Sequence, residues 1–205
     1  MYRLFFKRFF DIVLSGIAMI ILLPVYIVLA IIVRISMGSP ILFSQERIGK
    51  GEKPFKLYKF RSMTNKTDAN GNLLPEEQRV TKAGGLIRST SLDELPELWA
   101  IFIGDMSFIG PRPLRMADLP YFYENERARH NVRGGLIPPD SLSRKVFTTY
   151  EEQFEYEVYY ANHVSLWLDI KIFLYTFEII VKRMTEDYGN DFRPHLKEYR
   201  MNEKK

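Results

Sequence analysis

The chain has 205 residues, with no cysteine, three histidines, and 29 basic against 25 acidic side chains, so its formal net charge is +4. This length suits one domain with appendages, the missing cysteine excludes disulfides and thiolate metal sites, and histidines without ligand spacing do not predict a zinc centre. The small, scattered basic excess argues against nucleic-acid binding and suits anionic phosphates or an anionic membrane surface.

The N-terminal apolar segment, Ile12–Val33, carries no charged residue. As a helix it is long enough to cross a hydrocarbon core of about 30 Å. Pro24 near its middle predicts a break, because proline removes a helix hydrogen bond and clashes with the preceding turn. Basic residues flank both ends, Lys7 and Arg8 among them, so the charges assign no orientation. The residues alone leave two models open, a single-pass anchor and a helix that breaks at Pro24 and leaves on its side of entry.

Two strands and a helix are expected next. Residues 41–49 and 53–63 alternate in part and are joined by a glycine-containing turn, which predicts a hairpin. A polar loop over residues 64–78 follows. Residues Glu76–Arg88 are expected to form a helix that is interrupted or ends near Gly84–Gly85.

The stretch "IRSTSLDELPELW" holds two adjacent carboxylates. Ser91 followed by Glu94 predicts a capping box that starts a helix ending at Gly104, and in that interpretation Asp93 and Glu94 simply belong to its first turn. The alternative is a reaction centre. A helix N-terminus is expected to lower the pKa of Asp93, an ionised Asp can attack phosphorus, and paired carboxylates suit Mg²⁺. Spacing alone leaves both interpretations open.

Several cations are expected to lie near the acidic pair. Lys59 closes the second strand, Arg88 precedes the acidic pair, and Arg112 follows Pro111 in a Pro-Arg-Pro segment that holds the backbone extended. Arg133 is a further candidate. Each alone reads as a solvated charge, but rigid cations beside two carboxylates are what phosphoryl transfer requires.

The rest of the chain predicts more helix than strand. Residues 104–114 are expected to be extended, Met116–His130 a charged helix, and 132–145 a Gly/Pro-rich loop. Leu166–Val181 predicts an amphipathic helix too charged to span a membrane and suited to its interface or to the core. The tail from Met184 is polar and unassigned. Because strands and helices do not alternate regularly, the predicted fold class is α+β.

Taken in chain order, these motifs resemble the bacterial sugar transferases, specifically the small monotopic phosphoglycosyl transferases. The resemblance runs from about Lys7 to Arg183, and "RSTSLDELPEL" followed by "GDMSFIGPRPL" behind such an N-terminus is highly specific. The other matching segments are "FKRFFDIVLSGIAMIILLPV", "ILFSQERIGKGEKPFKLYKFRSM" and "YEVYYANHVSLWLDIKIFLYTFEIIVKR".

The resemblance implies an enzyme that transfers a sugar-1-phosphate from a UDP-sugar to a polyprenyl (undecaprenyl) phosphate and releases UMP. It implies a covalent phosphosugar intermediate on Asp93, with Glu94 as the second acid and Mg²⁺ bound by the pair. The residues implied at the substrate phosphates are Lys59, Arg88, Pro111, Arg112, Arg133 and Arg144.

The resemblance also implies where the protein lies and how it is divided. It places a re-entrant membrane helix at residues 1–36, broken at Pro24 with Lys7 and Arg8 at the membrane, a catalytic domain at 37–183 and a polar tail at 184–205. The expected location is the cytoplasmic face of the bacterial inner membrane, with downstream glycosyltransferases as partners in glycan assembly and no nucleic acid.

The main departure from the family lies in residues 133–145. Members usually carry an Arg-Pro-Gly start and a Gly-Trp-Ala-Gln-Val-Asn-Gly-Arg-type segment, where this chain reads "RGGLIPPDSLSRK". Arg133 is retained, and Arg144 or Lys145 stands near the later arginine. If this loop contacts the nucleotide or the sugar, the departure predicts a different specificity. The alternative is loss of activity, against which the intact acidic pair and basic residues argue.

Two other functions are weighed against the transferase. In a membrane-anchored, non-catalytic scaffold, Asp93 and Glu94 would only cap a helix. A single-pass glycosyltransferase that transfers the sugar alone would release UDP in place of UMP.

Overall fold

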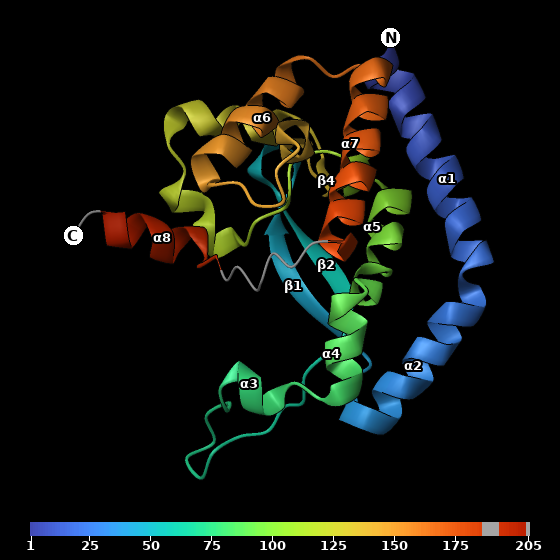
Figure 1. The fold of residues 1–205 in the computed structure, drawn as a ribbon, viewed down its shortest axis with the longest axis vertical. Helices are drawn as coiled ribbons and strands as arrows, with labels where there is room; N and C mark the ends of the chain where they lie inside the picture. The colour runs from blue at the N-terminus through green and yellow to red at the C-terminus, as the bar shows by residue number, and fades with distance from the viewer. Residues whose placement is uncertain (186–192, 204–205) are drawn as a thin grey trace.

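The computed structural model describes residues 1–185 and 193–203, and these residues form a mixed helix-and-strand fold, as the α+β expectation requires (Figure 1). The α-helices are α1 Lys7–Ile21, α2 Leu23–Met37, α3 Glu76–Arg79, α4 Lys82–Ser89, α5 Glu97–Ile103, α6 Tyr150–Asn162, α7 Leu166–Thr185 and α8 Leu196–Glu203. The strands are β1 Leu42–Ile48, β2 Pro54–Phe60, β3 Met106–Ile109 and β4 Gly134–Ile137. Short 3₁₀ turns connect several of them.

Helices α1 and α2 form one bent arm along a side of the molecule (Figure 1). Their axes differ by 62°, and the break falls at Leu22. Pro24 is the second residue of α2, a place where its missing N–H costs little. Within the described ranges no single helix is long and apolar enough to span a bilayer, whereas the bent pair passes that test together. The predicted break near Pro24 is confirmed.

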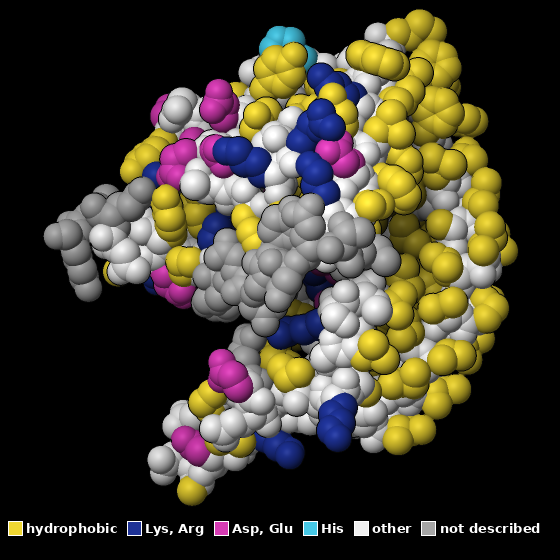
Figure 2. All heavy atoms as spheres, viewed as in Figure 1, with side chains coloured by type: hydrophobic (Ala, Val, Ile, Leu, Met, Phe, Trp, Pro, Cys, Tyr) yellow, Lys and Arg dark blue, Asp and Glu magenta, His cyan; other side chains and the backbone are white. Residues whose placement is uncertain are grey.

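One face of this arm is apolar and exposed. Ile20 is 76% exposed and Ile35 is 80% exposed. Figure 2 shows hydrophobic side chains gathered along the whole edge that α1 and α2 form. Helix α7 adds Trp167 (74% exposed) and Phe177 (64%), and its buried face carries Ile172. Soluble monomeric proteins rarely expose so many large apolar side chains along one edge.

The predicted hairpin is confirmed with shorter strands. β1 and β2 pair antiparallel, with Leu42 opposite Phe60 and Ile48 opposite Pro54. The turn is closed by the Gly49 N–H, which donates to the Lys53 carbonyl at 2.8 Å. This register fixes which side chains of β2 face the arm and which face away from it.

The predicted helix Glu76–Arg88 is divided earlier than its glycines indicate. It breaks at residues 80–81, and Thr81 caps α4 by accepting the Gly84 N–H at 2.9 Å. Gly84 lies inside α4. Only glycine fits at this position, because a Cβ would stand 1.9 Å from the Ser62 carbonyl oxygen. The glycine therefore marks a close approach of two backbones rather than a helix end.

The second sheet and its surroundings also differ from expectation. β4 lies in the segment predicted as a loop and pairs in parallel with β3. The predicted charged helix Met116–His130 is two 3₁₀ helices, Met116–Tyr121 and Glu124–Asn131, separated by extended backbone at Phe122. Glycine-rich β4 lacks the apolar alternation that normally signals a strand.

Two helices of the C-terminal part were absent from the sequence expectations. Thr149 begins α6 with a capping box to Glu152. Helix α8 falls in the tail, for which the sequence predicts no element, and Leu196 on it is fully buried in a core cluster with Phe154 and Ile48. Helix α7 confirms the predicted helix from Leu166. Of the expected polar tail 184–205, residues 186–192 and 204–205 lie outside the described residues.

Candidate active site

The acidic pair lies in a tight turn between α4 and α5, and the predicted capping box is wrong. Ser91 has a left-handed backbone conformation (φ 55°), and its carbonyl accepts the Glu94 N–H at 3.1 Å. Asp93 and Glu94 belong to the 3₁₀ turn Leu92–Glu94, and α5 begins only after Pro96. The Glu94 carboxylate points across to the hairpin instead of back to Ser91.

Lys59 connects the hairpin to this turn. Its Nζ atom donates to Oε1 of Glu94 at 2.6 Å and lies 3.1 Å from Oε1 of Glu97. A guanidinium nitrogen of Arg112 stands 3.5 Å from the same Glu94 oxygen. Glu94 is thus held between two cations, one from β2 and one from the segment after β3.

The electrostatics of the two acids diverge. Burial raises the pKa of Asp93, and the nearby charge of Lys59 offsets this only in part. Burial also acts to raise the pKa of Glu94, but Arg112 and Lys59 outweigh it and the pKa falls below its ordinary value. The expectation that a helix N-terminus lowers the pKa of Asp93 is therefore wrong. Two neighbouring titratable groups with opposite shifts are a common mark of catalytic sites.

The Pro-Arg-Pro segment is held from behind by a buried ion pair. Glu157, fully buried on α6, accepts the backbone N–H of Arg112 at 2.8 Å. Arg129 donates to the backbone carbonyl of Arg112 at 2.6 Å. Nε of Arg129 lies 2.6 Å from Oε2 of Glu157. Pro111 is buried, and its carbonyl accepts the Gly135 N–H at 2.9 Å. Both backbone groups of Arg112 are therefore fixed, while its side chain remains 55% exposed and points at Glu94.

Sequence reasoning missed two residues of this cleft, Glu97 and Arg47. Both line it together with Lys59, Glu94 and Arg112. Burial raises the pKa of Glu97, and Lys59 opposes that rise. A signal for Glu97 was present, because a charge stands among the apolar residues that begin α5. Arg47 carried a weaker signal, as one of two charged residues in β1.

The structure brings together Lys59, Glu94 and Arg112. Arg88 lies exposed in the last turn of α4, and its charge acts to lower the pKa of Asp93. Arg133 lies in a different hollow, where its Nε donates to the Gly104 carbonyl at 2.7 Å.

Arg144 is also placed elsewhere. It pairs with Glu178 of α7 through two hydrogen bonds of 2.9 Å and lies over the ring of Tyr175. No substrate role for Arg133 or Arg144 follows from these positions, and both roles stay predictions.

The residues expected at the membrane tie α1 to the rest of the fold. Nζ of Lys7 lies 2.8 Å from Oδ2 of Asp169 on α7. Arg8 donates to the carbonyls of Ile101 and Phe102 at the end of α5, each at 2.6 Å. These contacts fix the arm, and a membrane role for the two cations stays a prediction.

The magnesium site expected at Asp93 and Glu94 stays a prediction. Within residues 1–185 and 193–203 no group of three or more His, Cys, Asp or Glu side chains is arranged to hold a metal ion. Asp93 and Glu94 nevertheless offer adjacent carboxylates, and Mg²⁺ commonly takes one or two of these and completes its shell with water and substrate phosphates. Cations around two acids can bind a diphosphate and stabilise charge that develops on it.

A comparison with known families agrees with this geometry. The family model described as "Bacterial sugar transferase" matches residues 2–183. The chain is 43% identical over 171 residues to a Bacillus subtilis (strain 168) protein named "Uncharacterized sugar transferase EpsL", covering 83% of this chain and 84% of the relative.

Two further relatives carry names that state a reaction. A "UDP-glucose:undecaprenyl-phosphate glucose-1-phosphate transferase" of Klebsiella pneumoniae is 34% identical, covering 83% of this chain and 39% of the relative. A "UDP-N-acetylgalactosamine-undecaprenyl-phosphate N-acetylgalactosaminephosphotransferase" of Aeromonas hydrophila is 32% identical, covering 86% and 44%. The chain thus spans about two fifths of the length of these two relatives.

Proposed function

This chain belongs to the bacterial sugar transferase family, and from that premise we propose that it transfers a sugar-1-phosphate from a UDP-sugar to a polyprenyl phosphate and releases UMP. The observation that carries the proposal is the acidic turn at Asp93 and Glu94, set against Lys59 and Arg112 beside an apolar bent arm. The site and the arm together suit one phosphorylated sugar donor and one lipid acceptor.

In the first half-reaction, a carboxylate oxygen of Asp93 attacks the β-phosphorus of the UDP-sugar. The bond from that phosphorus to the bridging oxygen breaks, and UMP leaves with the electron pair. Asp93 is suited to this role because Glu94 is already engaged by Lys59, whereas Asp93 is half-buried and its carboxylate is raised in pKa, which leaves it more basic once ionised.

In the second half-reaction, a phosphate oxygen of the polyprenyl phosphate attacks the same phosphorus. The bond to Asp93 breaks, the carboxylate is regenerated, and the product is a sugar linked to the polyprenyl chain through a diphosphate. One site serves both halves, since donor and acceptor each present phosphate oxygens to the same cations.

Lys59, Arg88 and Arg112 are proposed to bind those phosphate oxygens. Arg112 is well suited because its backbone is fixed on both sides while its guanidinium stays accessible. A guanidinium fork matches phosphate geometry. A magnesium ion held by Asp93 and Glu94 together with the diphosphate would neutralise charge on the donor.

The protein is proposed to lie on the cytoplasmic face of a bacterial inner membrane, with the α1–α2 arm entering and leaving on one side. The exposed apolar edge of the arm (Figure 2) and the exposed apolar side chains of α7 support contact with a membrane. Downstream glycosyltransferases would extend the lipid-linked product in glycan assembly.

A single experiment tests the proposed chemistry. The full chain in detergent, with Mg²⁺, a panel of UDP-sugars and undecaprenyl phosphate, is expected to release UMP, and Asp93→Asn is expected to abolish the release. The control is Asp68→Asn, an equal change on the exposed loop after β2. Near-normal UMP release by Asp93→Asn would overturn the nucleophile. Release of UDP would indicate direct sugar transfer, and no release with any donor would favour a non-catalytic scaffold.

A further inference from the structure

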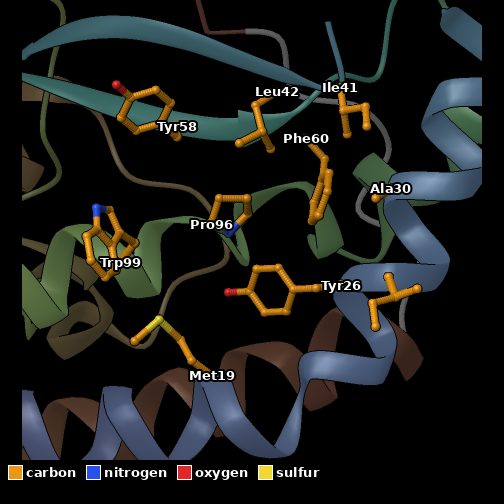
Figure 3. Close-up of a pocket in the computed structure, with 10 residues that line it drawn as sticks. Met19, Tyr26, Ala30, Ile41, Leu42, Tyr58, Phe60, Pro96 and Trp99 are labelled. Atoms are coloured by element: carbon orange, nitrogen blue, oxygen red, sulfur yellow. The ribbon is translucent and has the colours of Figure 1, made fainter. Parts of the chain in front are cut away.

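An apolar cavity of about 670 Å³ lies inside the bend of the α1–α2 arm (Figure 3). Met19 and Tyr26 reach into it from the arm, Leu42 and Phe60 from the hairpin, and Trp99 from α5. Its volume is in the range of sites that hold a small molecule or a segment of a lipid. The cavity is distinct from the polar cleft around Glu94.

This cavity and the polar cleft are built on opposite sides of the same two segments. Along β2, Tyr58 and Phe60 line the cavity, while Lys59 between them lines the cleft. Successive side chains of a strand point to opposite faces. At the start of α5, Pro96 lines the cavity and Glu97 lines the cleft. The cavity and the cleft therefore share one wall, formed by β2 and the start of α5, while Leu92 and Leu95 on either side of the acidic pair pack against the cluster that contains Phe60.

The cavity is continuous with the exposed apolar edge. Ile27 and Trp99 both line it, and they are 53% and 50% exposed. Its wall toward the acidic turn is fixed by Tyr26, whose hydroxyl donates to the Leu95 carbonyl at 2.5 Å. Leu95 directly follows Glu94 in the chain. One end of the cavity thus opens to the lipid-facing edge and the other adjoins the reaction centre.

We propose that this cavity binds the first part of the isoprenoid chain of the polyprenyl phosphate acceptor and so aims its phosphate at Asp93; this rests on the proposed function. The apolar lining matches a hydrocarbon with methyl branches. The acidic pair and its cations lie beyond the shared wall, so the phosphate would reach them from the end of the cavity next to Leu95. A diacyl phospholipid would place its headgroup at the same end, but its two chains diverge from a glycerol whereas the cavity is a single space. The remainder of the isoprenoid chain lies along the apolar edge.

The test uses a substitution that narrows the cavity and leaves the residues of the cleft unchanged. Ile27→Trp puts a larger side chain into the lining, and Val28→Trp makes the same kind of change at the adjacent residue, which is 54% exposed and outside the lining. Two measurements are made on each full-length variant in detergent. The first is exchange of labelled UMP into UDP-sugar without acceptor, which reports the donor half-reaction. The second is the KM for undecaprenyl phosphate.

For Ile27→Trp we expect unchanged UMP exchange and a KM for undecaprenyl phosphate raised about tenfold, which corresponds to about 1.4 kcal/mol. Val28→Trp is expected to change neither. Equal acceptor KM values for both variants and the unchanged chain would overturn the cavity assignment while leaving the proposed function intact. Absence of UMP exchange in the unchanged chain would instead overturn the proposed function.

A labelling experiment gives a readout independent of turnover. Undecaprenyl phosphate with a photoreactive group near the phosphate end is expected to label peptides that contain Met19 or Trp99, and excess undecaprenyl phosphate is expected to prevent the labelling. Labelling confined to the outer face of α7 would overturn the assignment. So would protection by phosphatidylglycerol equal to that by undecaprenyl phosphate, because it would make the cavity a general acyl-chain site.

Discussion

Lys59 and Glu94 form a salt bridge of 2.6 Å between β2 and the acidic turn, although they lie 35 positions apart in the chain. Both side chains are largely buried, with exposed fractions of 21% and 25%. Charge pairs shielded from water interact more strongly than exposed ones. The same ammonium also acts to lower the pKa of Asp93. Removing the Lys59 charge is therefore expected to raise that pKa, which a pH profile can measure.

In the variant Lys59→Gln, the pKa of Asp93 is expected to rise further above that of an ordinary aspartate, because the burial effect loses its counterweight. Asp93 must be ionised to attack, so activity is lost as pH falls through this pKa. The acid limb of the pH profile for UMP release is expected to move to higher pH. Lys56→Gln, an exposed change on the same strand, serves as the control. An acid limb shared by both variants would contradict the assignment.

A second prediction concerns the glycine pair in α4. Gly84→Ala is expected to destabilise the fold by about 1–3 kcal/mol, because its Cβ would overlap the Ser62 carbonyl oxygen at 1.9 Å and force the backbones apart. At Gly85 a Cβ would lie 3.9 Å from its nearest neighbour, on Val80. Gly85→Ala is therefore expected to be neutral or to stabilise by up to about 1 kcal/mol. Thermal unfolding of the two variants side by side measures the difference, and equal midpoints would contradict it.

A third prediction concerns the support of Arg112. Glu157→Gln leaves the buried guanidinium of Arg129 without its counter-charge, which typically costs about 3–5 kcal/mol. Chemical unfolding measures this loss, with Glu155→Gln, exposed on the same helix, as the control. Where the variant remains folded, the KM for the UDP-sugar is expected to rise, because the Arg112 backbone is less firmly held. An unfolding midpoint equal to that of the control would refute the prediction.

A fourth prediction concerns the path of the arm through the bilayer. The chain has no cysteine, so single cysteines can be introduced without background. Arg3→Cys lies before α1 and Lys53→Cys lies in the hairpin turn after α2, both on exposed residues. A membrane-impermeant maleimide is expected to label both from the cytoplasmic side and neither from outside. Labelling from opposite sides would mean that the arm spans the membrane.

Local patterns carried much of the fold. The hairpin, the break near Pro24 and the helix from Leu166 each follow from signals within a few neighbouring residues. β4 was missed because Gly134 and Gly135 give no strand signal, since they serve close contact with Gly110 and the prolines instead.

The sequence named three residues that the structure brings together, Lys59, Glu94 and Arg112, but it did not predict how they meet. Asp93, Glu94 and Arg112 were named from motif and resemblance, while the capping box failed because Glu94 is satisfied by Lys59 from a distant strand. Such a partner competes with a local cap and cannot be seen in the sequence near Ser91. Glu97 was missed for the same reason, since its pairing with Lys59 depends on how β2 meets α5.

The two faces of β2 set a rule for where this chain can vary in length. One residue inserted or removed within the strand would exchange the side chains on its two faces. Lys59 would then point into the apolar cavity and Phe60 into the polar cleft. The exposed loop at residues 65–73 carries no such constraint. Natural length differences among relatives are therefore expected to collect in that loop and to spare the strand.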